Sequence, residues 1–537
     1  MAARNGVPIF RGCRSLRAFH RTSRQGPRKR YLSNGGISPL NQPPLNQPLQ
    51  DMPPSPASMI GGTESWQNRH DHVTHVTTLE NGIRVASEDS FGQFSTIGVV
   101  IDAGSRYEVE YPAGLSHLLE KLSFQSTVKY KTNDDITQEL EKFGGMADCT
   151  SFRDAIIYGT SCFTSGVPTV MEVLSEGVLQ PRLTDQEIEE QKMVVQFELE
   201  NLDMKPDPEP ALTDLIHAAA FRDNTVGLPK LCPPENINMF NSSILFDYMK
   251  QYYQPSRMVI AGVNVDHQHL IDLTRTHFIH KKPVWFKEGE KVATPDRSIA
   301  QYTGGMIKDH RIEPRINPGP TPLPELAHLS IGLESCNYED PDFFAFTVLN
   351  TLMGGGGSFS AGGPGKGMYS RLYLNVLNRY HWIYSATAYH HSYADTGLFC
   401  IHGSCHPTKL RDLAQVFVKE YFALVSGEVN EVEVARAKKQ LQSMLMMNLE
   451  SRIIVFEDIG RQVLGLNKRK SSQELFHSIE NVTVEDVKRI AFRMLASKPS
   501  VAGLGNLTTL PKYQEVQHAF GNSGNFTGAS RFFLFRN

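Results

Sequence analysis

The sequence predicts an α+β protein made of two tandem copies of one domain, each a mainly antiparallel sheet covered by helices. Its 537 residues exceed what one compact core normally holds. Alternating apolar runs typical of strands are interspersed with amphipathic segments typical of helices over residues 74–507. The order of these segments recurs about 230 to 245 residues further on. These observations together indicate a duplicated domain.

The first copy is expected to open with a β-hairpin, because Asn81-Gly82 separates two alternating runs in "VTTLENGIRVASE". The long helix of this copy has Thr184 as its N-cap, followed by an acidic first turn. The other elements follow in chain order: an apolar strand from 94, helices in 114–124 and 136–145, paired strands in 148–163, helices in 165–179 and 183–202, and a closing strand in 256–265.

The second copy repeats this order with little identity. The repeated parts are a strand and turn in 325–340, a strand and helix in 394–422, a long helix in 429–445 and a last strand in 498–507. The sequence thus predicts five segments along the chain: a transit peptide in 1–33, a flexible Pro- and Gly-rich linker in 34–70, the first domain in 71–280, an interdomain linker in 281–325 and the second domain in 326–537.

The first 50 residues differ sharply in charge from the rest. They contain eight arginines, one lysine and no acidic residue. Without these nine cations, 45 basic and 57 acidic residues remain, a net charge of −12. Arg11, Arg14, Arg17 and Arg21 recur at helical spacing among apolar residues, which is typical of a mitochondrial transit peptide. A basic arm that binds nucleic acid is the alternative.

Composition excludes several other classes of protein. Hydrophobic residues at 40% and charged residues at 21% are ordinary for a globular chain, and no apolar run reaches the length of a membrane span. The seven cysteines show no CxxC pairing, so a disulfide framework or a zinc ribbon is not expected.

A short helix carries the motif that points to a function. "GLSHLLEKLS" (114–123) places His117, Glu120 and Lys121 on one helix face, since positions i, i+3 and i+4 are neighbours. In an inverted zinc motif, H-x-x-E-H, the two histidines bind the metal and the glutamate is the general base. The segment resembles the helix of the pitrilysin-type zinc peptidases, with Lys121 in place of the second histidine. The duplicated α+β layout fits that family too.

The resemblance also implies where a third zinc ligand would lie. In this family it is a glutamate roughly 75 residues further on, with an auxiliary glutamate seven residues before it. Glu190 matches the auxiliary position, which puts the ligand position at Phe197. An ammonium repels a cation and a phenyl ring offers no lone pair, so a catalytic role and a bound metal are not expected at His117, Glu120, Lys121 and Phe197. Glu120 is expected to bridge to Lys121.

An active zinc endopeptidase with substitute ligands is an alternative. Glu198 and Glu200 carry carboxylates, but on a helix they are turned about 100° and 300° from position 197. The histidines and cysteines of 390–406 follow no ligand spacing and are expected to be structural.

The most distinctive segment is "GGGGSFSAGGPGKG" (354–367), in which nine of 14 residues are glycine or proline. It lacks the GKS or GKT ending of a phosphate-binding loop. Glycine loses more conformational entropy on folding than other residues, so ordering this segment is costly. A long loop of this kind inside a compact domain is usually functional or disordered. Resemblance to a substrate-binding member of the same family implies that this segment binds substrate, with these candidate residues: Gly354, Gly355, Gly356, Gly357, Ser358, Phe359, Gly362, Gly363, Gly365, Lys366 and Gly367.

This segment and "VVQFELENLDMKPDPEP" make the chain similar to a non-catalytic, substrate-binding member of the family. The resemblance implies a heterodimer in the mitochondrial matrix, in which a zinc-bearing β subunit cleaves and this chain binds the basic presequences of imported proteins. It implies no cofactor in this chain and no nucleic acid. An acidic body would attract a basic presequence.

A structural role remains open on the sequence alone. Core subunits of respiratory complex III share the fold and lack the full zinc motif, so a scaffold within that complex is the alternative. Association of a processing subunit with that complex at the inner membrane is compatible with the same sequence.

Overall fold

The computed structural model describes residues 73–204, 208–222, 224–286, 294–311, 325–357, 367–427 and 429–521. The predicted transit peptide and the linker of 34–70 lie outside these residues, as do positions 358–366 of the glycine-rich segment. None of the described helices is long and apolar enough to cross a bilayer.

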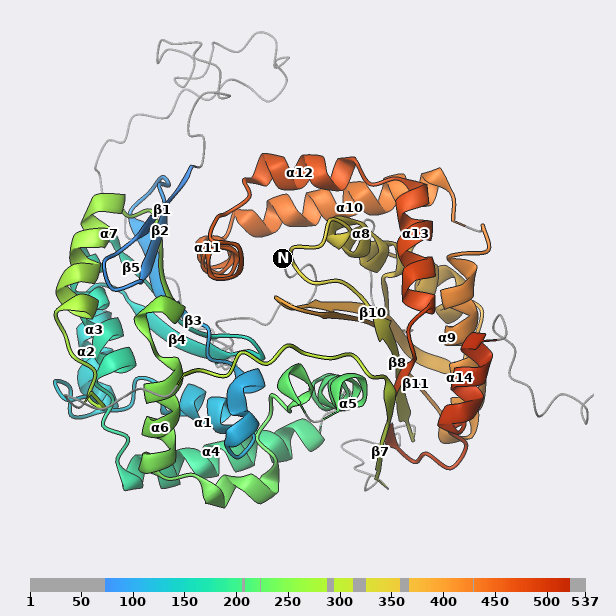
Figure 1. The fold of residues 1–537 in the computed structure, drawn as a ribbon, viewed down its shortest axis with the longest axis horizontal. Coiled ribbons are helices and arrows are strands. Elements are labelled where there is room, and N and C mark those ends of the chain that lie inside the picture. Colours follow the sequence, from blue (N-terminus) through green and yellow to red (C-terminus); the bar gives the residue numbers. More distant parts are fainter. Residues whose placement is uncertain are drawn as a thin grey trace, which may run out of the picture. The chain divides into compact units, whose positions relative to one another are not determined.

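The first half of the described chain forms a six-stranded sheet (Figure 1). Its strands are β1 (Thr74–Thr78), β2 (Arg84–Glu88), β3 (Phe94–Ile101), β4 (Met146–Ser151), β5 (Ile156–Phe163) and β6 (Met258–Val263). They lie in the order β1-β2-β6-β3-β5-β4, and every pair is antiparallel except β2 with β6. The predicted hairpin is confirmed, because Thr78 pairs with Arg84 across the turn at Asn81-Gly82.

The second half forms another six-stranded sheet. Its strands are β7 (Gly305–His310), β8 (Ala327–Glu334), β9 (Gly355–Gly357), β10 (Ile383–Ser392), β11 (Gly397–Cys405) and β12 (Ser500–Gly505). The order is β7-β12-β8-β11-β10-β9, with a single parallel pair, β7 with β12. In both sheets the last strand of the half is parallel to one neighbour and antiparallel to the other. The predicted duplicated α+β fold is confirmed.

Helices cover these sheets (Figure 1). In the first half they are α1 (Leu115–Leu122), α2 (Asn133–Glu141), α3 (Val167–Leu179), α4 (Asp185–Asp203), α5 (Glu209–Phe221), α6 (Ser242–Tyr252) and α7 (His267–Thr274). In the second they are α8 (Phe343–Met353), α9 (Leu410–Ala423), α10 (Glu431–Leu449), α11 (Arg452–Leu466), α12 (Ser472–Glu480), α13 (Val484–Leu495) and α14 (Tyr513–Gly521). Thr184 caps α4 as predicted, since its side chain accepts the N–H of Glu187.

Two helices complete the core of the opposite half. Helix α5, from the first half, packs on β7, β8 and β12 of the second sheet, and its Ile216 is fully buried there. Helix α11, from the second half, packs on β2, β3 and β6 of the first sheet. The ring of Phe456 in α11 lies over the cross-strand pair Gly98 and Gly159. Each half therefore depends on the other for its apolar cover.

The segment 281–325, predicted to be an interdomain linker, also contains a strand. Gly305–His310 forms β7 and pairs with β12 at the edge of the second sheet. The segment "GMIKDH" begins with glycine and is followed by a Pro-rich run, so it carries little strand signal on its own. The edge of β12 supplies the hydrogen bonds that order it.

Candidate functional site

A buried carboxylate fixes the start of helix α1. Glu108 accepts the N–H of Gly114 at 2.6 Å, and the N–H and hydroxyl of Ser116 at 2.7 and 2.5 Å. Gly114 has φ of +97°, and a Cβ there would lie 2.3 Å from Cα of Cys232. A negative group is stabilising at a helix N-terminus. Burial nevertheless raises the pKa of Glu108 to about 7. This anchor holds the helix that carries His117.

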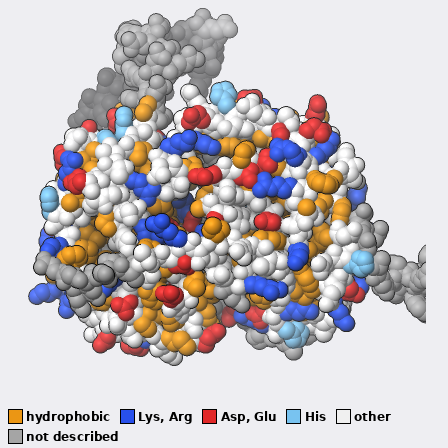
Figure 2. Space-filling model, viewed as in Figure 1, with side chains coloured by type: hydrophobic (Ala, Val, Ile, Leu, Met, Phe, Trp, Pro, Cys, Tyr) orange, Lys and Arg blue, Asp and Glu red, His pale blue; other side chains and the backbone are white. Residues whose placement is uncertain are grey.

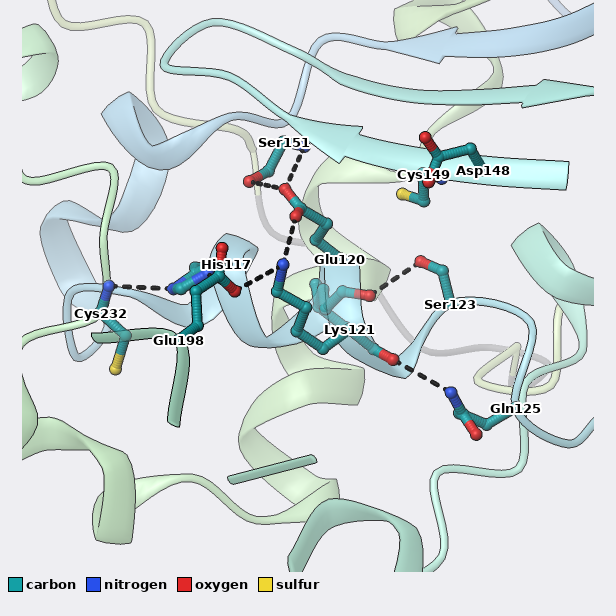
Figure 3. Close-up of polar contacts among 11 residues, drawn as sticks. His117, Glu120, Lys121, Ser123, Gln125, Asp148, Cys149, Ser151, Glu198 and Cys232 are labelled. Carbon is teal, nitrogen blue, oxygen red and sulfur yellow. Dashed lines mark hydrogen bonds and ion pairs between the residues drawn. The ribbon is translucent and has the colours of Figure 1, made fainter. Parts of the chain in front are cut away.

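Side chains of α1 and α4 converge on one another (Figure 3). Nε2 of His117 lies 3.3 Å from Oε2 of Glu198, and Nζ of Lys121 lies 2.7 Å from the same oxygen. Nζ of Lys121 also lies 2.8 Å from Oε1 of Glu120, which confirms the predicted bridge between these two residues. We call His117, Glu120, Lys121 and Glu198 the α1–α4 pocket.

Glu120 ties this pocket to the sheet. Its Oε2 accepts the backbone N–H of Ser151 at 2.7 Å and the hydroxyl of Ser151 at 2.8 Å, at the end of β4 (Figure 3). Both oxygens of the Glu120 carboxylate therefore have partners, one on Ser151 of β4 and the other on Lys121. This carboxylate is not free to act as a general base.

The hydrogen bonds of His117 define where its proton lies. The backbone N–H of Cys232 donates to Nδ1 at 3.2 Å, so Nδ1 carries the lone pair. The proton of the neutral imidazole is then on Nε2, which donates to Glu198. A zinc-ligating histidine shows the opposite arrangement, with a lone pair toward the metal and an N–H toward an acceptor.

The pocket is a coupled set of charges. The hydrogen bond from His117 and the neighbouring ammonium of Lys121 lower the pKa of Glu198 to about 2, against the effect of burial. Burial by itself would raise the pKa of Glu120 and lower that of Lys121. Their mutual attraction, together with other nearby charges and hydrogen bonds, outweighs burial in both, so the pKa of Glu120 lies below its ordinary value and that of Lys121 above its own. All three groups are charged at neutral pH.

The structure corrects the assignment of Phe197. The side chain of α4 that reaches His117 is Glu198, whereas Phe197 is 62% exposed. The buried positions Ile188 and Val195 set the rotation of α4, and this rotation turns position 198 toward α1. Glu190 is exposed and accepts a hydrogen bond from Gln186, so the match that placed the ligand at 197 is one residue out of register.

Two of the three positions that face one another in this pocket therefore carry metal-ligand side chains, His117 and Glu198. Only position 121 lacks one. Glu200, the other substitute considered from sequence, is exposed and accepts a hydrogen bond from Gln196. The prediction that two of the three ligand positions lack a metal-binding side chain was therefore wrong at one of them, because Glu198 and not Phe197 faces His117.

The residues present do not fit a zinc ion. A catalytic zinc needs three protein ligands and an open position. Here the ammonium of Lys121 lies at bonding distance from both carboxylates, and His117 presents a proton to Glu198. Throughout the described ranges, no cluster of three or more His, Cys, Asp or Glu side chains is arranged to hold a metal.

Two of the histidines of 390–406, which are expected to be structural, lie in neighbouring strands of the second sheet. His402 is buried in β11 and His390 is half-buried in β10, and desolvation lowers the pKa of both to about 3. Nε2 of His402 lies 3.3 Å from Sγ of Cys400. These imidazoles are neutral packing groups at any physiological pH.

The described part of the glycine-rich segment is an edge strand. Gly355 pairs with Thr387, and Gly357 with Ser385, at the end of the second sheet. Gly354 has φ of +56° and Gly355 has φ of +103°, and a Cβ on Gly355 would lie 2.0 Å from the carbonyl oxygen of Ala386. These two glycines are required by the strand itself. A Cβ on Gly356 would meet nothing within 4 Å.

A hollow of about 400 Å³ lies at the base of this segment. It is lined by Leu352 before the segment, by Met368 and Tyr369 after it, and by Met444 and Met447 of α10. Unbranched methionines adapt to differently shaped apolar partners. Ser358, Phe359, Gly362, Gly363, Gly365 and Lys366 lie outside the described residues. Gly367 is described, with φ of +84°.

Both halves match models of one family of peptidases. Residues 84–234 match the insulinase family model (peptidase family M16), and residues 240–441 match the model of the M16 inactive domain. A solved structure of a protease from Helicobacter pylori aligns with a TM-score of 0.69 at 19% identity, over 80% of this chain and 99% of that one, which shows the shared fold. The chain belongs to the insulinase family of peptidases, family M16.

Within this family the chain is similar to one kind of subunit. It is 52% identical over 496 residues to the mitochondrial-processing peptidase subunit alpha of Homo sapiens, covering 92% of each chain. The subunit alpha of Caenorhabditis elegans is 38% identical over 524 residues, covering 97% of this chain and 98% of that one. The subunit alpha of Solanum tuberosum is 33% identical over 484 residues, covering 89% of each.

Proposed function

We propose that this chain is the non-catalytic, substrate-binding subunit of a mitochondrial processing peptidase. In this role it binds the basic presequences of imported precursors, and a zinc-bearing β subunit cleaves them in the matrix. The observation that carries the proposal is the ammonium of Lys121, which lies 2.7 and 2.8 Å from the two carboxylates of the α1–α4 pocket. A pocket filled in this way cannot activate a water molecule through a metal.

The names of the relatives support the division of labour. A subunit alpha of a processing peptidase works beside another subunit, and the three relatives named above carry that description. The α1–α4 pocket lies in the part of the chain that matches the peptidase model, and there the ammonium of Lys121 contacts both carboxylates. We therefore assign the catalytic step of this assembly to the partner.

The glycine-rich segment is the proposed binding element. Its first residues form β9 at the edge of a sheet, where an extended peptide can add main-chain hydrogen bonds that do not depend on its sequence. The hollow beside it offers an apolar, methionine-containing surface for side chains. Such a combination suits substrates that share charge and amphipathicity without sharing a sequence.

Long-range attraction would add to these contacts. Residues 51–537 have a net charge of −12, which favours encounter with a basic peptide. On the face drawn in Figure 2, however, acidic and basic side chains are interspersed. We therefore assign the binding energy to local contacts and the net charge to the association rate.

The test is a titration of a fluorescent presequence peptide with the mature chain, without a partner. We expect binding without cleavage, and a loss of about tenfold or more in affinity when residues 358–366 are deleted and β9 is kept. Gly465→Ala is the matched control, because Gly465 lies in α11, away from the glycine-rich segment, and a Cβ there would meet nothing within 4 Å. Equal affinity of the deletion variant and the wild type would exclude the glycine-rich segment as the binding element.

Alanine replacement inside 354–357 is a poorer test at two positions. At Gly354 a Cβ would lie 2.4 Å from Cβ of Ser370, and at Gly355 it would meet the carbonyl of Ala386, so both changes damage the strand itself. Gly357→Ala is acceptable, because its nearest neighbour would be 3.9 Å away. An effect of this variant on affinity reports on binding.

A further inference from the structure

The α1–α4 pocket differs from a three-ligand metal site at a single side chain. We propose that the ammonium of Lys121 takes the place of a divalent cation between His117, Glu198 and Glu120, and that the one substitution Lys121→His is sufficient to make the pocket bind zinc. This inference concerns the pocket alone and does not rest on the proposed substrate or partner.

The position of the ammonium supports the first part. Nζ of Lys121 lies 2.7 Å from Glu198 of α4 and 2.8 Å from Glu120 of α1, and the second carboxylate is anchored on β4 (Figure 3). One cation thus joins two helices and a strand end, as a bound metal ion would. The carboxylates are close enough to repel each other strongly without it.

The geometry of α1 supports the second part. Position 121 is one turn from His117 on the same helix face, so a histidine there would be directed to the same space. In the Lys121→His variant, His117, the introduced imidazole and Glu198 would provide two nitrogens and one oxygen, which is a ligand set that zinc accepts with one position left open. Glu198 is 38% exposed, so the pocket is accessible to an ion from solvent.

The hydrogen bond at Nδ1 of His117 opposes metal binding, and its effect on the zinc affinity can be estimated. To ligate through Nε2, His117 must give up the hydrogen bond that Nδ1 accepts from the N–H of Cys232. The ring proton then lies on Nδ1 and faces the N–H of Cys232, so a buried donor is left without an acceptor, which weakens an affinity by about tenfold to a hundredfold. A third ligand in a preformed site gains far more than that. We therefore expect the single substitution to suffice.

The experiment measures zinc bound to the purified mature chain by elemental analysis after equilibration with a zinc buffer. We expect the wild type to retain only traces and Lys121→His to retain an equivalent of zinc per chain. Lys121→Met is the matched control, since it removes the ammonium and adds no strong ligand. Lys121→His combined with Glu198→Gln removes the third ligand and is expected to lose most of the gain. The absorption spectrum of the Co²⁺-loaded protein checks for tetrahedral coordination.

Two results would overturn the proposal. One is an equivalent of zinc in the wild type that is lost on His117→Ala. The other is a Lys121→His variant that is folded by circular dichroism and holds no more zinc than Lys121→Met.

A second measurement covers the case in which Lys121→His does not fold. If the ammonium is the cation of this pocket, Lys121→Met leaves repelling carboxylates and lowers the Tm, and adding Glu198→Gln to it restores part of the loss. If Lys121→Met combined with Glu198→Gln has a lower Tm than Lys121→Met, and the two single losses simply add, this role of Lys121 is contradicted.

Discussion

At the scale of the residue, the α1–α4 pocket shows what spacing alone can establish. The spacing of His117, Glu120 and Lys121 identified the helix and its missing histidine, because the i, i+3 and i+4 positions of a helix share a face in any fold. Glu198 could not be placed in this way. Its direction depends on the rotation of α4 about its own axis, which the packing of Val195 determines. Ser151 and Cys232, which complete the pocket, come from a strand end and a loop without any motif.

The pocket predicts a pH dependence of stability. The pKa of Glu198 is lowered from 4.5 to about 2 in the folded chain, so its ionised form stabilises the fold above about pH 4.5, and this contribution is lost as the pH falls toward 2. Because Glu198 is 38% exposed, water screens the interaction, and we expect Glu198→Gln to cost about 1 kcal/mol at pH 7. Urea unfolding at pH 7 and at pH 3 measures this difference, which should shrink at the lower pH. Glu200→Gln, on the exposed face of the same helix, is the control, and an equal loss in both variants would argue against the pocket as the cause.

At the scale of the element, the strands of the first sheet and the long helices α4 and α10 were predicted from sequence, whereas several elements were not, among them α5, α11 and strands β7, β9 and β10. Two of these strands, β7 and β9, contain glycine and lie at sheet edges, and β9 has only 3 residues. Their own residues have little preference for extended structure, and the neighbouring strands supply the hydrogen bonds that order them. The long helix α4, in contrast, carries its start signal in Thr184 and Glu187 and was found where it was predicted.

The contact of α11 with the first sheet gives a prediction at this scale. A Cβ on Gly98 would lie 2.1 Å from the carbonyl oxygen of Tyr158 and 2.5 Å from Cζ of Phe456. We expect Gly98→Ala to destabilise the chain by about 1–3 kcal/mol through overpacking. Gly465→Ala, on the exposed side of α11, should stabilise it by up to about 1 kcal/mol, because alanine favours a helix. Thermal unfolding of both variants distinguishes them, and a Gly98→Ala variant as stable as the wild type would show that α11 shifts freely on the sheet.

At the scale of the whole described chain, buried ion pairs join the two halves. Arg106 of the first half and Asp395 of the second lie 2.6 Å apart between Nη2 and Oδ2, with exposed fractions of 6% and 18%. Asp395 also accepts the N–H of Ala300 at 2.7 Å. Neither residue stands in a motif, and their meeting depends on the assembled fold. Contacts of this kind are the part of the structure that sequence patterns do not report.

This pair is expected to matter more for stability than an ion pair at the surface. Asp395→Ala leaves the buried guanidinium of Arg106 without its partner, and we expect a loss of about 3 kcal/mol. Asp412→Ala removes the partner of Lys409 in a pair that is about half exposed, and should cost less than about 0.5 kcal/mol. Urea unfolding of the two variants provides the comparison. Similar losses would contradict the greater weight given to the pair of Arg106 and Asp395.

The exchange of α5 and α11 also bears on how the chain is made. Strand β6 ends at Val263, and with it every strand of the first sheet has been synthesised. The apolar face that carries Val100 and Ala261 nevertheless has no cover until Phe456 and its neighbours follow. During synthesis, all strands of the first sheet therefore emerge from the ribosome while one apolar face of this sheet is still exposed, well before α11, the helix that covers it, has been made. Folding of the first half must wait for the second, and during that interval the nascent chain is a natural client for a chaperone.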